Sequence, residues 1–181
     1  VQFSAKDQLI AFGDTQGGLR LWQVNDRQEI PLEHSGATGG IKALTFSPSS
    51  EHLAIASSDG TARVLDIATG KHTITLQHEE AVITVSFSDN GDKLLTASLD
   101  GTARVWDAET GQELRRLDHN SSVYDARFDW SDSRIATASE DGIVRVWNNE
   151  SEKPQQQFLH NDIVWDVQFS PDGQKLATSS S

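Results

Sequence analysis

The sequence predicts an all-β fold made of repeated four-stranded antiparallel sheets. A nearly identical ten-residue segment recurs with a step of 41 residues, at 57–66, 98–107 and 139–148. A phenylalanine recurs with the same step, at Phe46, Phe87, Phe128 and Phe169. A fixed period of this length indicates that one structural unit is repeated along the chain.

The repeat at 87–106 shows why each unit is read as a series of short strands. Turn sequences, Asp89-Asn90-Gly91 and Asp100-Gly101, separate apolar segments of about six residues. Asn-Gly and Asp-Gly suit tight reversals because Gly adopts positive φ freely and Asn or Asp tolerates it. The first expected strand of this unit ends at 87, and the other three cover 93–98, 102–106 and 112–117. In the next unit the fourth strand contains Pro154, which suits a solvent-facing edge.

A period in the low forties that ends in Trp-Asp, with a His upstream, indicates the blades of a β-propeller. Trp106-Asp107, with DGTARV at 100–105 before it, resembles the WD-repeat family, and the pattern covers nearly the whole chain. Two units depart from it, since Leu65 stands at the Trp position and Asn148 at the Asp position. The resemblance implies a β-propeller of four-stranded antiparallel blades.

The 181 residues hold about 4.4 repeats. The expected units are blade 1 at about 1–33, blade 2 at 34–77, blade 3 at 78–118, blade 4 at 119–159 and a partial blade 5 at 160–181. Propellers have about four to eight blades. Both ends fall inside a blade, so we expect part of a larger, seven-bladed ring whose other blades come from further chain or another subunit. The flanks of the terminal blades should expose apolar residues.

Composition excludes several classes of function. Lys plus Arg number 15 and Asp plus Glu 27, and the net charge of −12 disfavours binding to a nucleic-acid backbone. No apolar run approaches the roughly 18 residues that cross a bilayer. The absence of Cys excludes disulfides and thiolate chemistry and fits a reducing, cytoplasmic location. We expect no cofactor and no metal, because a phosphate-binding Gly-rich loop is missing and four of the six His belong to the repeat.

Four polar residues recur with fixed offsets and look catalytic at first sight. The two complete sets are His78, Thr96, Asp100, Trp106 and His119, Thr137, Asp141, Trp147. Seen once, His, Thr and Asp would suggest a hydrolase with a Thr nucleophile. Their recurrence in successive repeats indicates structure instead. The resemblance implies a hydrogen-bonded chain from Trp to Thr, then to His, then to Asp, which satisfies four buried polar groups at once.

The first half of the chain lacks this set. Blade 2 keeps His34 and Asp59 but has Ile55 and Leu65 at the Thr and Trp positions. Blade 1 has Phe12 and Gln16 at the Thr and Asp positions. We expect these two blades to be held by apolar packing and to open more easily than the centre of the chain.

The first strand of each unit predicts a β-bulge. Apolar residues lie five and two positions before the repeated Phe, as Val123 and Ala126 do before Phe128. Burying all three needs one extra residue, because a regular strand puts residues two apart on one face. The side chain of the bulge residue can point away from the core, and its identity differs between repeats. The four bulge residues are Lys42, Ile83, Tyr124 and Trp165.

These variable residues are the predicted partner-binding surface. We add the residues two positions before them, Ser122 and Ile163, and those before the turn Asp, which are Ser58, Leu99 and Glu140. Tyr124 and Trp165 are the strongest candidates, since aromatic anchors beside charged residues dominate interface hot spots.

Two further features lie outside this surface. An Arg recurs two positions before the Trp or its replacement, and we expect it to join neighbouring blades, with a ligand-binding ring as the alternative. The residues are Arg20, Arg63, Arg104 and Arg145. Trp130 occupies a turn position where sister repeats have Pro48, Asp89 and Pro171. We expect it to pack on the edge of its own blade or to make a contact on the face opposite the bulges.

The sequence thus predicts a non-catalytic scaffold that binds a protein or peptide, with basic partners favoured by its acidity and with no nucleic acid or membrane. One alternative is the sensor or autoinhibitory WD-repeat region of a larger regulated ATPase or kinase. Another is an enzyme that uses channel carboxylates such as Asp125 and Asp166.

Overall fold

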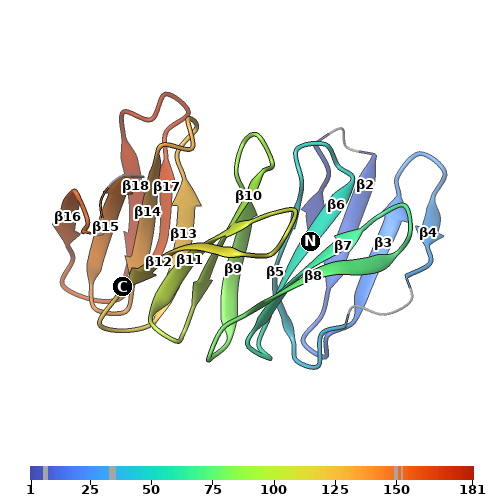
Figure 1. The fold of residues 1–181 in the computed structure, drawn as a ribbon, viewed down its shortest axis with the longest axis horizontal. Helices are drawn as coiled ribbons and strands as arrows, with labels where there is room; N and C mark the ends of the chain where they lie inside the picture. Colours follow the sequence, from blue (N-terminus) through green and yellow to red (C-terminus); the bar gives the residue numbers. More distant parts are fainter. Residues whose placement is uncertain (6–7, 33–35, 149–150, 152) are drawn as a thin grey trace.

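The chain is all β over the residues that its computed structural model describes, which are 1–5, 8–32, 36–148, 151 and 153–181 (Figure 1). Its strands form four four-stranded antiparallel sheets and one two-stranded sheet, and each sheet keeps the strands in sequence order. The predicted fold class is confirmed. Within the described ranges no helix is long and apolar enough to cross a membrane.

We number the sheets as blades 1 to 5. Blade 1 contains β1 (Gln2–Phe3), β2 (Leu9–Gly13), β3 (Leu19–Gln23) and β4 (Gln28–Ile30). Blade 2 contains β5 (Ile41–Phe46), β6 (His52–Ser57), β7 (Thr61–Asp66) and β8 (Lys71–Gln77). Blade 3 contains β9 (Val82–Phe87), β10 (Lys93–Ser98), β11 (Thr102–Asp107) and β12 (Glu113–Asp118). Blade 4 contains β13 (Val123–Phe128), β14 (Arg134–Ser139), β15 (Ile143–Asn148) and β16 (Gln156–Leu159), and blade 5 contains β17 (Val164–Phe169) and β18 (Leu176–Ser180).

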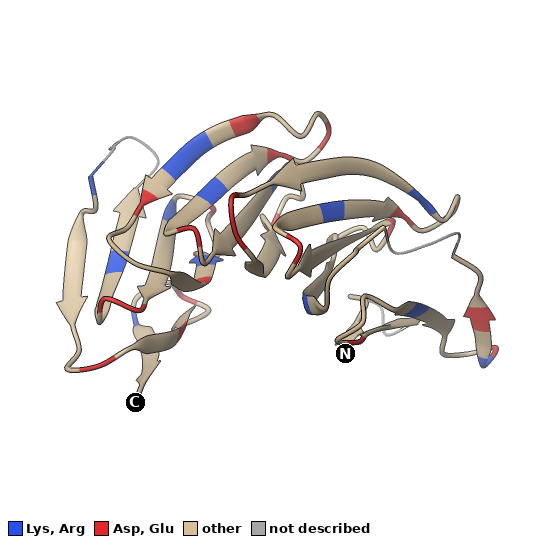
Figure 2. Cartoon of the chain, turned by 90° about the horizontal axis from the view of Figure 1, so that it is seen from below, with Lys and Arg blue, Asp and Glu red and all other residues tan. Residues whose placement is uncertain are grey.

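The blades lie side by side along an open arc (Figures 1 and 2). The first strands of successive blades, β5, β9, β13 and β17, contact one another and form the inner side of the arc. Many Asp and Glu residues lie in the turns between strands (Figure 2).

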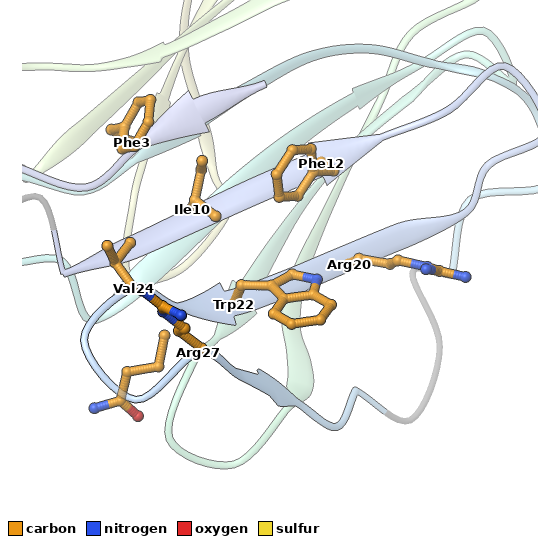
Figure 3. Close-up of a pocket in the computed structure, with 8 residues that line it drawn as sticks. Phe3, Ile10, Phe12, Arg20, Trp22, Val24 and Arg27 are labelled. Atoms are coloured by element: carbon orange, nitrogen blue, oxygen red, sulfur yellow. The ribbon is translucent and has the colours of Figure 1, made fainter.

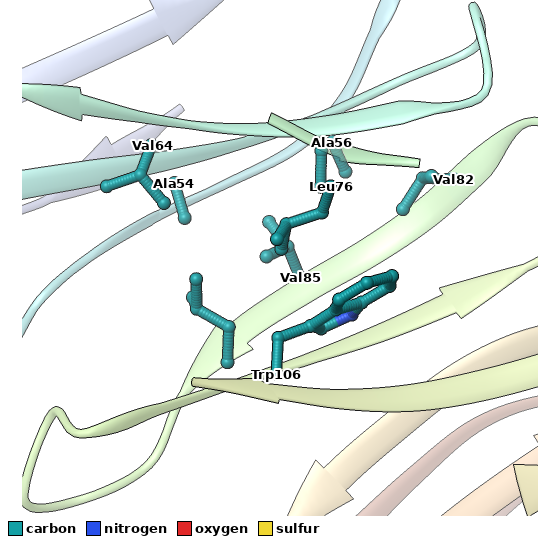
Figure 4. Packing of buried hydrophobic residues seen from close by; sticks show 9 residues of the cluster. Ala54, Ala56, Val64, Leu76, Val82, Val85 and Trp106 are labelled. Atoms are coloured by element: carbon teal, nitrogen blue, oxygen red, sulfur yellow. The ribbon is translucent and has the colours of Figure 1, made fainter. Parts of the chain in front are cut away.

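Neighbouring blades pack through complementary faces, one with small residues and one with larger ones. Ala54 and Ala56 of blade 2 share a buried cluster with Val85, Leu94 and Trp106 of blade 3 (Figure 4). The next residue along β10, Leu95, belongs instead to the cluster between blades 3 and 4. Because successive side chains of a strand point to opposite faces, each blade that lies between two others contributes to two such interfaces.

A histidine directly follows the fourth strand of blades 2, 3 and 4, and its main-chain N–H extends the ladder of that blade to the glycine of the turn before the third strand. The N–H of His78 donates to the carbonyl of Gly60 at 2.8 Å, that of His119 to Gly101 at 2.9 Å and that of His160 to Gly142 at 2.8 Å. Each glycine follows the Asp of a tight turn and has positive φ, 81° at Gly101. Gly adopts this conformation without the steric cost of a Cβ atom. The chain is therefore held to the turn of one blade at the point where the ring of the same histidine enters the next blade.

The four recurring polar residues of blade 3 are hydrogen-bonded in sequence. Trp106 Nε1 donates to Thr96 Oγ1 at 2.9 Å, and Thr96 Oγ1 lies 2.7 Å from His78 Nε2. His78 Nδ1 lies 2.8 Å from Asp100 Oδ2. A carboxylate only accepts, so Nδ1 carries the proton and Nε2 accepts from the Thr hydroxyl. Four buried polar groups thus satisfy one another, and the Thr hydroxyl has no opening to act as a nucleophile.

Burial and hydrogen bonding set the charge states of the His and the Asp in this hydrogen-bonded set. Burial lowers the pKa of His78, against the opposing effect of the Asp100 carboxylate, so the ring is neutral at neutral pH. Burial alone would raise the pKa of Asp100, but hydrogen bonds from Thr102 and His78 outweigh it and lower the pKa to about 2.

Blade 4 keeps the first two links and loses the third. Trp147 Nε1 donates to Thr137 at 3.0 Å, and Thr137 lies 2.7 Å from His119 Nε2. His119 Nδ1, however, donates to the carbonyl of Leu117 at 3.0 Å. The expectation that Asp141 ends this chain is therefore wrong. Burial, followed by the charge of Arg145, lowers the pKa of His119 to about 4.

One missing hydroxyl explains the difference between the two blades. In blade 3, Thr102 Oγ1 donates to Asp100 Oδ1 at 2.6 Å and accepts from Arg104 Nε at 2.9 Å, so that Arg104 Nη2 reaches Asp100 Oδ2 at 2.9 Å and shares this oxygen with His78. Blade 4 has Ile143 at the position of Thr102.

Without that hydroxyl, both oxygens of Asp141 bind the Arg145 guanidinium, at 3.1 and 2.6 Å. Such bidentate pairing is a strong arrangement for Arg and a carboxylate, and it holds Asp141 on the Arg145 guanidinium, while His119 Nδ1 bonds to Leu117 instead.

The other blades carry shorter versions of this set. His160 Nε2 lies 3.1 Å from Thr178 Oγ1 in blade 5. In blade 2, Ile55 and Leu65 are fully buried in an apolar cluster. His34, the remaining expected member there, lies outside the described residues.

The recurring arginines act mainly inside their own blades, not between blades as expected. Arg63 pairs with Asp59 at 3.0 Å, Arg104 with Asp100 at 2.9 Å and Arg145 with Asp141 at 2.6 Å, always four residues apart. One of their hydrogen bonds crosses a blade boundary, from Arg104 Nη1 to the carbonyl of Gln77 at 3.2 Å. The i, i+4 spacing follows from the turn, which brings the Asp beside the third strand.

Restoring the hydroxyl in blade 4 should complete its hydrogen-bonded chain. We predict that Ile143→Thr draws Asp141 toward the ring of His119, raises the pKa of that ring from about 4 and stabilises the protein by about 1 kcal/mol, the net value of one hydrogen bond. The pKa is measured by NMR titration of the imidazole and the stability by urea unfolding. Ile143→Val is the control, because it changes the side-chain volume without adding a hydroxyl. An unchanged His119 pKa in Ile143→Thr would refute this explanation.

Candidate partner-binding site

Every innermost strand from blade 2 onward contains the predicted bulge. In blade 4 the ladder passes from the pair Val123 and Ser139 to the pair Asp125 and Ala138 and skips Tyr124. In the first strands of blades 2, 3 and 5 the ladder skips one residue in the same way, namely Lys42, Ile83 and Trp165. The extra residue sits near the start of its strand, at the same level in each blade.

The turns beside these bulges bring the other candidate residues to the same edge of the sheets. The main-chain N–H of Glu140 donates to the carbonyl of Ser122 at 2.9 Å, and that of Leu99 to Ala81 at 3.0 Å. Ser58 binds Gly40 in the same way at 2.9 Å. We call this edge the bulge face. It comprises Lys42, Ser58, Ile83, Leu99, Ser122, Tyr124, Glu140, Ile163 and Trp165, all of which are exposed or half-buried.

Two aromatic rings from neighbouring blades meet on the bulge face. The ring centroids of Tyr124 and Trp165 are 4.7 Å apart, with planes tilted by 43°. Trp165 is 46% exposed, and its Nε1 donates to Ser181 Oγ at 2.8 Å. The pair therefore offers a fixed apolar surface to solvent at the junction of blades 4 and 5.

A carboxylate stands beside this pair. Glu140 accepts hydrogen bonds from the hydroxyls of Ser121 at 2.6 Å and Ser122 at 3.0 Å, and these bonds lower its pKa. Burial, and then the nearby charge of Glu140, raise the pKa of Tyr124. An aromatic surface next to an ionised carboxylate suits a cationic side chain.

Sequence reasoning missed two residues of this arrangement, Ser121 and Ser181. Ser181 stands 41 residues after Glu140, so extending the repeat by one step would have found it. Ser121 gives no repeated signal, because its role depends on the conformation of the loop before β13.

The two carboxyls named for an enzyme lie at the interface of blades 4 and 5. Asp125 is 2% exposed, and its Oδ2 accepts the N–H of Val167 at 3.2 Å and Arg127 Nε at 3.2 Å. Asp166 is exposed. Burial raises the pKa of Asp125 to about 6, with a further contribution from Asp166, while the charge of Arg127 opposes it. Asp125 therefore faces the neighbouring strand β17. Over the described ranges, no group of three or more His, Asp or Glu residues could hold a metal ion.

A large apolar hollow of about 640 Å³ lies on the outer face of blade 1 (Figure 3). Phe3, Ile10 and Trp22 line it, and Phe3 is 52% exposed. These residues are paired across β1, β2 and β3 as Phe87, Leu94 and Trp106 are across blade 3. In blade 3 this face is covered by blade 2, so the hollow has the composition of a blade interface. It is the exposed apolar flank that the sequence predicts.

The raised pKa of Asp125 makes the interface of blades 4 and 5 sensitive to pH. Its ordinary pKa is 3.8 and its folded value about 6, so protonation favours the folded state. The corresponding stability, on the order of 3 kcal/mol, is fully present below about pH 4 and lost as the pH rises through 6.

We therefore predict that Asp125→Asn gains stability relative to the parent chain as the pH increases from 4 to 7. Urea unfolding at several pH values measures this difference. Asp118→Asn, at an exposed position, should follow the parent profile. If the difference in unfolding free energy between Asp125→Asn and the parent chain did not change with pH, the raised pKa of Asp125 would be contradicted.

The NUP159/214 β-propeller model matches residues 1–180. A ribosome biogenesis protein WDR12 homologue of Chlamydomonas reinhardtii is 38% identical over 71 residues, which are 36% of this chain and 16% of that protein. U3 small nucleolar RNA-associated protein 15 of Saccharomyces cerevisiae is 32% identical over 88 residues, which are 46% of this chain and 17% of that protein. The matched segments span less than a fifth of either relative.

A solved structure is similar over almost all of the chain. The crystal structure of the computationally designed Ika8 protein aligns with a TM-score of 0.86 and 27% identity, over 99% of this chain and 54% of that chain. The chain thus spans about half the length of the designed protein. Repeat, blade architecture and family model agree. The chain belongs to the NUP159/214 β-propeller family and is a WD-repeat β-propeller.

Proposed function

We propose that this chain is a non-catalytic scaffold that binds a protein segment on the bulge face, with Tyr124 and Trp165 as anchors. The observation that supports it is the ring pair, 4.7 Å apart and partly exposed, on the edge where the repeats differ from one another. Rigid aromatic surfaces of this kind supply much of the binding energy of protein interfaces. The hydrogen-bonded strands behind the pair hold it in place before binding.

The charge of the site favours a basic segment. Glu140 stands beside the rings, and the whole chain carries −12. A Lys or Arg side chain between the rings and this carboxylate would gain both cation–π and ionic stabilisation.

The names of the relatives support a role in assemblies of proteins and RNA, since one is a ribosome biogenesis protein and the other is associated with a small nucleolar RNA. Within such an assembly, the acidic surface favours contact with protein over contact with phosphates. The cytoplasmic location expected from composition stays a prediction.

Removing both rings should abolish binding without unfolding the protein. Labelled peptides that differ only in a central Arg, Lys, Gln or Glu are titrated by fluorescence anisotropy. We predict that the Arg and Lys peptides bind best, and that the double variant Tyr124→Ala, Trp165→Ala weakens them at least tenfold while its melting temperature stays within a few degrees. Glu140→Gln should remove most of the preference for basic peptides.

Leu159→Ala is the matched control, because it removes an exposed apolar side chain on the outer strand of blade 4. Its affinity should equal that of the parent chain. Unchanged affinity in the double variant would refute the proposed site.

A further inference from the structure

A second surface lies at the opposite edge of the sheets, around Trp130. This residue is 70% exposed, in the turn between β13 and β14. The bulge residue Tyr124 lies near the start of β13, whereas Trp130 follows its end, so the two surfaces are separated by the length of the strand. Of the two placements expected from the sequence, packing against its own blade is wrong.

The loop that carries Trp130 is held rigidly. Asp129 is 3% exposed, and its Oδ1 accepts the N–H groups of Ser133 at 2.9 Å and Arg134 at 3.1 Å. Its Oδ2 accepts Arg134 Nε at 2.8 Å. The exposed ring is therefore presented by an ordered turn, which reduces the entropy that a partner must overcome on binding.

Neighbouring blades fix the same loop from both sides. On one side, Asp132 accepts the N–H of Asp89 in blade 3 at 3.1 Å. On the other, Arg134 Nη2 donates to the carbonyl of Gly173 in blade 5 at 2.7 Å, and its guanidinium lies 5.2 Å from the ring centre of Phe169. Three blades thus contribute to one fixed surface.

A groove of about 290 Å³ lies next to the Trp130 ring. Its apolar lining comes from the ends of the innermost strands, at Phe87, Phe128 and Phe169. This volume is at the lower end of the roughly 300–1,000 Å³ of ligand pockets, which suits one or two side chains of a peptide. We call this surface the Trp130 groove.

The charge of the Trp130 groove indicates what it would take. Asp89, Asp129 and Asp132 are among its lining residues, and Lys, Arg and His are absent from that lining as the structure describes it. Asp129 is occupied by its own loop, while Asp89 and Asp132 lie toward the rim and are less buried. An apolar floor with carboxylates at its edge complements an apolar side chain flanked by basic ones.

We propose that the Trp130 groove binds an extended peptide segment in which an apolar side chain is flanked by Lys or Arg. This surface is separate from the bulge face, so the protein can hold two protein segments at once. The apolar side chain packs against Trp130 and the inner-strand phenylalanines, and the flanking cations lie beside Asp89 and Asp132.

The test uses three short labelled peptides, with the central sequences Lys-Leu-Lys, Glu-Leu-Glu and Lys-Gly-Lys. The indole N–H resonance of Trp130 in the ¹H–¹⁵N spectrum reports contact, and titration gives the affinity. We expect only Lys-Leu-Lys to shift this resonance appreciably. Equal binding of Glu-Leu-Glu or Lys-Gly-Lys, or no shift with any peptide at millimolar concentration, would overturn the proposal.

Two variants identify the groups responsible. Trp130→Asp installs the residue that blade 3 has at the equivalent position, so the turn should tolerate it. It should weaken Lys-Leu-Lys at least tenfold, and because it adds a negative charge, that loss would be due to the ring. Asp132 has φ 53°, a conformation that Asn also tolerates, and Asp132→Asn should weaken the basic peptide at least threefold. Full affinity in either variant would count against the proposal.

The bulge-face variant Tyr124→Ala, Trp165→Ala is the control for location. It should bind Lys-Leu-Lys in the Trp130 groove as the parent chain does. Loss of this binding in that variant would assign the peptide to the bulge face and refute a second site.

Discussion

The fold depends on a histidine at the boundary between blades. In His78 the main-chain N–H binds the turn glycine of the preceding blade, while the imidazole binds Thr96 and Asp100 of its own blade. One residue therefore couples docking between blades to order within a blade. The coupling needs a neutral ring, since one nitrogen must donate and the other accept. Burial supplies that condition by lowering the pKa of the ring.

This arrangement frees other positions for recognition. The apolar clusters and the hydrogen-bonded chains use residues that recur in the repeats, and the β-bulge places one non-recurring residue per blade on a common edge. Lys42 and Ile83 can differ from Tyr124 and Trp165 because none of them is needed to close a core. The surface chemistry of the bulge face can thus vary while the blade architecture stays the same.

Acidic groups serve different purposes according to their surroundings. Asp129 and Asp100 are fixed by hydrogen bonds and hold turns in place. Asp125, at a blade interface with fewer donors, keeps a raised pKa. Glu140, Asp89 and Asp132 lie beside aromatic residues at the two edges of the sheets. These three carboxylates lie where the proposed partners would approach, whereas Asp100 and Asp129 stabilise turns of the fold.

The sequence by itself determined the all-β blades, the turns, the bulged residues and three links of the chain in blade 3, because each depends on local pattern repeated every 41 residues. It did not determine which partners Asp141 takes, since without a hydroxyl at position 143 both of its oxygens bind Arg145 and His119 bonds to Leu117. Nor did it place the arginines within their blades, bring Tyr124 to Trp165, or leave Trp130 exposed. These outcomes depend on contacts between blades and on competition among hydrogen-bond partners, which only the packed structure resolves.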